Sequence, residues 1–65
     1  MELLIWKKRS EKNMKLEELS RLSGISISAL SNYENGLRYP NMKQMEGIAK
    51  ALGSRIEELY TSKYK

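Results

Sequence analysis

The side chains best suited to chemistry are short hydroxyl and amide groups that recur between Gly24 and Gly36. They are Ser26, Ser28, Ser31, Asn32 and Asn35. Such groups donate and accept hydrogen bonds, and an Asn amide can form two bonds with adenine at once. The chain has no His and no Cys, which excludes Ser-His and Cys-His catalysis and thiolate or imidazole metal sites. The pattern favours recognition through hydrogen bonds, and we expect no enzyme activity, cofactor or metal.

Two helical runs separated by a very short turn must position these side chains. The first covers residues 16–23 and ends at Gly24, because glycine readily adopts the left-handed conformation that follows many helices. The second covers residues 27–35, with Ser26 as its N-cap. The apolar side chains expected in their shared core are Leu19, Ile25, Leu30 and Tyr33. So short a turn makes the helices cross steeply, as in a helix-turn-helix, whose second helix can lie in the major groove of DNA.

The apolar pattern outside this unit predicts three more helices, and hence an all-α, compact five-helix domain that spans residues 1–65. The added helices cover about residues 2–12, 42–52 and 55–61. Asn41, directly after Pro40, is the expected N-cap of the helix over 42–52. Gly47 inside that helix costs roughly 1 kcal/mol relative to alanine. A chain of 65 residues has room for one small core.

Charge and hydropathy limit the kinds of partner. The net charge of +4 favours a polyanion such as nucleic acid, although an ordinary basic surface explains the charge equally well. No apolar run approaches the length of a transmembrane helix, and the apolar segment near the N-terminus lacks the basic residues that precede the core of a signal peptide. We therefore expect a cytoplasmic protein that has no membrane partner.

Several short motifs together resemble the phage-repressor and Cro type of helix-turn-helix protein, also called the xenobiotic-response-element family. The similarity runs from about Leu4 to Tyr60. Its motifs are Glu17-Glu18-Leu19-Ser20, Ser23-Gly24-Ile25-Ser26, Leu30-Ser31-Asn32-Tyr33-Glu34-Asn35-Gly36, Pro40-Asn41, Ile48-Ala49-Lys50-Ala51-Leu52-Gly53 and Glu57-Glu58-Leu59. A lone helix-turn-helix pattern is common by chance, but here the Glu-x-Gly helix end, the Pro loop and the following helix all fall in register.

The resemblance implies which residues contact DNA. The residues expected to contact base edges are Ile27, Ser28 and Asn32. The Asn32 amide is suited to adenine, and the Ile27 side chain is suited to a thymine methyl group. The helix over 27–35 itself carries no Lys or Arg, so attraction to phosphate must come largely from the residues around it. The phosphate contacts that we expect are Lys15, Ser26, Ser31, Asn35, Arg38, Tyr39 and Lys43. We expect Asn35, Arg38 and Tyr39 beside one strand, with Lys43 joining them and Lys15 on the other side. The alternative interpretation is a polar helix face that only meets solvent.

The resemblance also pairs Arg9 in the first helix with Glu34 near the end of the third. A bidentate guanidinium would neutralise a carboxylate that otherwise repels phosphate. The alternative is two unrelated surface charges. One departure from the family lies at the start of the second helix, where Ser or Thr followed by a phosphate-binding Gln is usual. Here the residues are Lys15, which can contact phosphate, and Leu16, which cannot donate a hydrogen bond and would suit a protein contact.

These features predict a sequence-specific transcriptional regulator of double-stranded DNA, a repressor that occludes a promoter in a bacterial or phage-infected cell. The resemblance implies a homodimer on a palindromic operator. We expect the dimer contact at the helix over 55–61 and the loop before it. A regulatory protein is a further expected type of partner. The alternative function is a protein-interaction module of the same fold, antitoxin-like or bridging, which Trp6, Leu16 and Leu22 would serve as apolar contacts.

Overall fold

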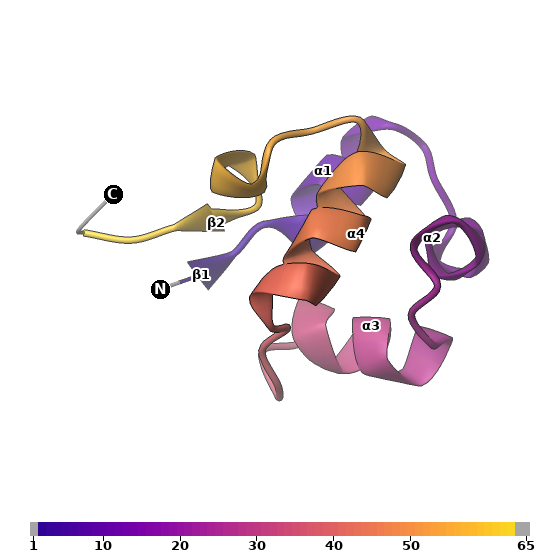
Figure 1. Ribbon diagram of the computed structural model, residues 1–65, viewed down its shortest axis with the longest axis horizontal. Coiled ribbons are helices and arrows are strands. Elements are labelled where there is room, and N and C mark those ends of the chain that lie inside the picture. Colours follow the sequence, from indigo (N-terminus) through magenta and orange to yellow (C-terminus); the bar gives the residue numbers. More distant parts are fainter. Residues whose placement is uncertain (1, 64–65) are drawn as a thin grey trace.

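The computed structural model describes residues 2–63, which form four α-helices and a small two-stranded sheet (Figure 1). The helices are α1 (Ile5–Glu11), α2 (Leu16–Ser23), α3 (Ile27–Glu34) and α4 (Met42–Leu52). The strands are β1 (Glu2–Leu3) and β2 (Tyr60–Thr61), and a 3-10 turn, η1 (Ile56–Glu58), precedes β2. Residues 1, 64 and 65 of the predicted domain lie outside this description. Within residues 2–63, no helix combines the length and apolar character that crossing a membrane requires.

The predicted five helices are wrong at both ends of the chain. Glu2 and Leu3, expected in the first helix, form β1 and pair antiparallel with Thr61 and Tyr60. The segment expected as a fifth helix is η1 followed by β2. The Leu4 N–H continues the pairing by donating to the Leu59 carbonyl at 2.6 Å. Short terminal helices are marginal, because few of their backbone groups bond internally, whereas strand pairing satisfies groups from both ends of the chain.

The core lies around α4, which occupies the centre of the molecule with α2 to one side and α3 below (Figure 1). Its buried apolar side chains come from all four helices and from the segment after η1. They are Ile5, Leu19, Leu30, Tyr33, Met45, Ile48, Ala49, Leu52 and Leu59. Ile25, expected among them, is only partly buried and packs against this cluster. Burial of Leu30 and Tyr33 attaches α3 to the rest of the molecule.

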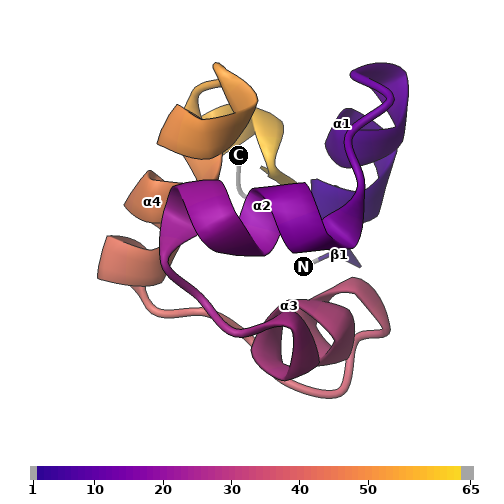
Figure 2. The same cartoon turned by 90° about the vertical axis from the view of Figure 1, so that its right-hand side faces the viewer.

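The turn between α2 and α3 has the expected caps. Gly24 ends α2 in the left-handed region, with φ of 74°, and its N–H donates to the Ser20 carbonyl. The Ser26 hydroxyl accepts a hydrogen bond from the Ala29 N–H at 3.1 Å, which begins α3. Figure 2 shows α2 passing across α3 with this turn joining their ends. The predicted boundaries of α2 and α4 are confirmed, and α3 ends one residue before the predicted position.

Gly47 within α4 and Gly53 directly after it should respond in opposite ways to substitution by alanine. A Cβ at Gly47 would lie 3.4 Å from the Ser23 carbonyl oxygen, a close but tolerable contact between α4 and α2. Gly47→Ala should therefore raise the free energy of unfolding by about 0.5–1 kcal/mol through helix propensity. Gly53→Ala should lower it by about 1–2 kcal/mol, because its backbone is left-handed with φ of 63°.

Thermal unfolding followed by circular dichroism measures both changes, since 1 kcal/mol moves the midpoint of so small a domain by about 4–8 °C. A lower midpoint for Gly47→Ala would show that α2 and α4 meet too closely for any side chain.

Candidate nucleic-acid interface

The outward face of α3 carries a continuous stripe of short polar side chains. Ser28 lies three and four residues before Ser31 and Asn32, and Asn35 lies four and three residues after them, so all four share one face. Ser28 and Asn35 are exposed, while Ser31 and Asn32 are partly buried. Ile27, in the first turn, is 45% exposed. Because Leu30 and Tyr33 turn inward, the three predicted base-contact residues lie on the side of α3 that is open to solvent or a partner.

Hollows lie at both ends of α3 and gather several of the predicted phosphate contacts. Ser26 and Lys43 line one hollow of about 480 Å³, between the α2–α3 turn and the start of α4. Asn35 and Tyr39 line another, of about 410 Å³, at the C-terminal end of α3. Lys43 thus lines the same hollow as Ser26, whereas Asn35 and Tyr39, beside which the sequence suggested it, line the other one.

The other predicted phosphate contacts lie around these hollows. Lys15 is the exposed N-cap of α2 and makes no side-chain cap hydrogen bond. Arg38 is exposed in the segment that joins α3 to α4. Ser31 accepts a long hydrogen bond, 3.4 Å, from the Asn35 amide. A bond of that length is weak, so both side chains can exchange it for a ligand at little cost.

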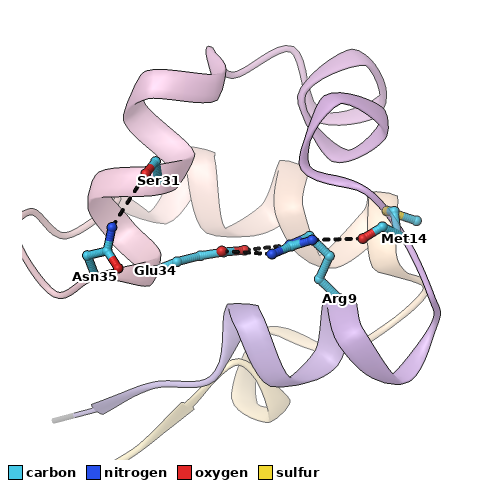
Figure 3. A network of polar contacts seen from close by, with 5 residues as sticks. All are labelled: Arg9, Met14, Ser31, Glu34 and Asn35. Atoms are coloured by element: carbon cyan, nitrogen blue, oxygen red, sulfur yellow. Dashed lines mark hydrogen bonds and ion pairs between the residues drawn. The ribbon is translucent and has the colours of Figure 1, made fainter.

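Arg9 joins α1, the α1–α2 connection and α3 (Figure 3). Its Nε donates to Glu34 Oε2 at 2.7 Å, and its Nη2 donates to Glu34 Oε1 at 3.0 Å. Nη1 donates to the Met14 carbonyl at 2.9 Å. The Arg9 and Glu34 side chains are only 16% and 8% exposed, so solvent screens the pair weakly. Hydrogen bonding to Glu34 raises the pKa of Arg9 further above its usual high value.

This ion pair decides the electrostatic character of α3. Glu34 is the one charged residue among residues 27–34, and its carboxylate is turned toward Arg9 (Figure 3). Ser31 and Asn35 meanwhile bond to each other along α3. A bidentate guanidinium satisfies both carboxylate oxygens, so α3 presents no uncompensated negative charge to a polyanion.

The apolar residues that favoured a protein partner divide into two groups. Trp6 is 59% exposed and Leu22 is 46% exposed, as that interpretation requires. Leu16 is partly buried against the core, which removes it as an exposed contact. Its packing against the core gives the apolar side chain at the start of α2 a structural role.

Gln44 is a residue of this surface that the sequence reasoning missed. Its side-chain oxygen accepts a hydrogen bond from the backbone N–H of Asn41 at 2.9 Å, and its backbone N–H donates to Asn41 Oδ1 at 2.8 Å. This capping box fixes the start of α4 beside the hollow that Lys43 and Gln44 share. The signal was present as Asn followed three residues later by Gln, a known helix-start pattern.

Comparison with known proteins places this arrangement in a family. Residues 7–59 match the sequence model of a helix-turn-helix family. The chain belongs to the Cro/repressor-type helix-turn-helix family. This confirms the family that the motifs predicted, and regulators of this family bind DNA.

Two similar proteins have names that describe a regulatory role. An HTH-type transcriptional activator, BcrR of Enterococcus faecalis, is 37% identical over 51 residues, which cover 78% of this chain and 25% of that protein. The chain thus spans about a quarter of that relative's length. The crystal structure of the restriction-modification controller protein C.AhdI from Aeromonas hydrophila matches with a TM-score of 0.82 and 28% identity. That match covers 86% of this chain and 85% of the controller protein.

The Arg9–Glu34 pair predicts a stability loss when its charge is removed. Glu34→Gln keeps the shape but gives up a charge-assisted bond and leaves Arg9 partly buried without a counter-charge, so the free energy of unfolding should fall by about 1–3 kcal/mol. Urea denaturation measures the change. Glu46→Gln, an exposed residue of α4, is the matched control and should stay within about 0.5 kcal/mol of the parent. Equal stability of the two variants would mean that the pair contributes nothing.

Proposed function

We propose that this protein is a transcriptional regulator that recognises double-stranded DNA by sequence, with α3 in the major groove. The observation that carries the proposal is the outward stripe of Ser28, Asn32 and Asn35 between two hollows lined by predicted phosphate contacts. The family membership and the regulatory names of the relatives support it. A helix of this width fits the major groove, whose base edges carry a distinct pattern for each base pair.

Base recognition is assigned to Ile27, Ser28 and Asn32. Asn32 can form two hydrogen bonds with adenine, and the exposed Ile27 can pack on a thymine methyl group. A serine hydroxyl accepts or donates and so discriminates little between bases. The half-site should therefore contain A·T pairs where Ile27 and Asn32 meet it.

Affinity is assigned to contacts with the phosphate backbone. The residues that make them are Lys15, Ser26, Ser31, Asn35, Arg38, Tyr39 and Lys43. No Lys or Arg occurs within residues 27–34, so attraction to the polyanion must come from the segments on either side of α3. Phosphate contacts of this kind set the register of a protein on DNA, while base contacts set its specificity.

We further propose a homodimer on a palindromic operator, which represses transcription by covering a promoter. Half-sites of such operators lie about 34–36 Å apart. The longest extent of the Cα trace is 31 Å, which is close to this half-site separation. An apolar groove of about 260 Å³ near η1 supports the predicted position of the dimer contact. It is lined by Leu3, Pro40, Met42, Met45, Ile56 and Tyr60.

The competing function is binding to a protein through the same fold, as an antitoxin-like or bridging module. It is favoured by large exposed apolar side chains, with Leu37 72%, Met42 67% and Trp6 59% exposed. Phosphate contacts release counterions, so DNA affinity falls steeply with salt, whereas a protein contact of apolar character does not. The salt dependence of binding therefore separates the two functions.

Arg38→Ala tests the phosphate contacts through that dependence. In gel shifts from 50 to 200 mM salt, the parent should lose affinity steeply, and the variant should bind all sequences more weakly with a log–log slope smaller by about 0.9. Lys50→Ala, which removes an exposed positive charge from the last turn of α4, is the control and should keep the parent slope. If the DNA affinity of the parent protein does not change with salt concentration, the result would support the competing function.

Asn32→Ala tests base recognition. The parent first selects duplexes from a randomised library, and selection of palindromic sequences is expected for a homodimer. The variant should bind the selected duplex about 1–3 kcal/mol more weakly, while its affinity for a random duplex stays unchanged. An equal loss on both duplexes would assign Asn32 to the backbone or to stability instead.

A further inference from the structure

Two serine hydroxyls of α2 hold both backbone polar groups of one residue in the turn. The Ser20 hydroxyl donates to the Ile25 carbonyl at 2.6 Å, and the Ile25 N–H donates to the Ser23 hydroxyl at 3.3 Å. The Ser20 carbonyl also accepts from the Gly24 N–H at 2.9 Å. Ser20 therefore contacts the turn through its backbone and its side chain, and the shorter bond is the one from its hydroxyl.

The bond to the Ile25 carbonyl acts directly on the start of α3. That carbonyl belongs to the peptide unit that leads into Ser26, the N-cap of α3. The orientation of this peptide sets where Ser26 lies and in which direction Ile27 and Ser28 leave the turn. Ile25 is anchored on its other side by packing against the core. The Ser20 hydroxyl thus restrains the rotation of this peptide.

We propose that Ser20 is a positioning residue for DNA recognition, whose hydroxyl fixes the start of α3 so that Ile27 and Ser28 meet base edges in register. This inference rests on the proposed function. Recognition side chains must be held to within about 0.5 Å by the groups behind them, because a base contact that is slightly displaced loses its hydrogen bond. A phosphate contact on a flexible Lys or Arg tolerates such displacement better.

The test removes the hydroxyl and compares two DNA probes. Ser20→Ala should bind the duplex selected by the parent protein about tenfold more weakly, the size of effect expected of a lost base contact. Binding to a random duplex of equal length should change less than about twofold, since it depends on phosphate contacts. Alanine raises helix propensity in α2, which offsets part of the stability lost with the hydrogen bond. Binding is therefore compared well below the unfolding midpoint of Ser20→Ala, where unfolding does not account for a loss.

Two further variants are controls. Ser10→Ala removes an exposed serine hydroxyl from α1 and should leave binding to both duplexes unchanged. Ser20→Thr keeps a hydroxyl at the position and should restore most of the preference for the selected duplex. A second readout needs no DNA, because the amide of Ile25 should exchange its hydrogen severalfold faster in Ser20→Ala than in the parent as the turn loosens.

The outcomes separate the two proposals. If the parent prefers its selected duplex and Ser20→Ala keeps the same preference, the role of Ser20 is overturned and the proposed function stands. An equal loss on both duplexes also overturns it, because a merely structural effect weakens all binding. A parent protein without any preference between duplexes overturns the proposed function and this inference together.

Discussion

The burial of Leu30 and Tyr33 is the constraint on which the rest of the structure depends. A helix as short as α3 is not stable alone, because so few backbone bonds form after the costly first turn. Packing of these two side chains against the core holds it in place. The same packing decides the rotation of α3 about its axis, and so which residues face outward. Ser28 and Asn32 reach the surface because the helical repeat places them away from Leu30 and Tyr33.

Electrostatics adds a second requirement to this helix. A free carboxylate at position 34 would weaken the attraction of α3 to phosphate. The same carboxylate accepts the hydrogen bonds that hold α3 to α1, so it must be neutralised without being lost. Arg9 satisfies both conditions, because its planar group bonds both oxygens of Glu34 and the Met14 carbonyl together. Arg9 thus joins three segments of the chain, and its ion pair with Glu34 neutralises the one negative charge of α3. A lysine could not do the same, since it lacks the fork geometry.

Local signals predicted the middle of the chain well and its ends poorly. Gly24, Ser26 and Asn41 act on neighbouring residues, so their effect on helix boundaries is visible in the sequence. The pairing of Glu2 with Thr61 joins residues that are far apart in the sequence, so no local sequence pattern predicts it. The hollow that Lys43 lines was not predicted for the same reason, because it depends on how the start of α4 packs beside the α2–α3 turn. The resemblance implied the pairing of Arg9 with Glu34, which spacing alone does not reveal.

The misassigned ends also bear on the candidate interface. The Leu4 N–H bonds to the Leu59 carbonyl, and Ile5 is buried directly after it. These contacts fix the start of α1, so the segment after α4 helps decide where α1 lies. Because α1 carries Arg9, that position in turn determines whether the guanidinium reaches Glu34. The strand pair is therefore connected to the outward face of α3 through one helix and one ion pair, although none of its residues is assigned a DNA contact.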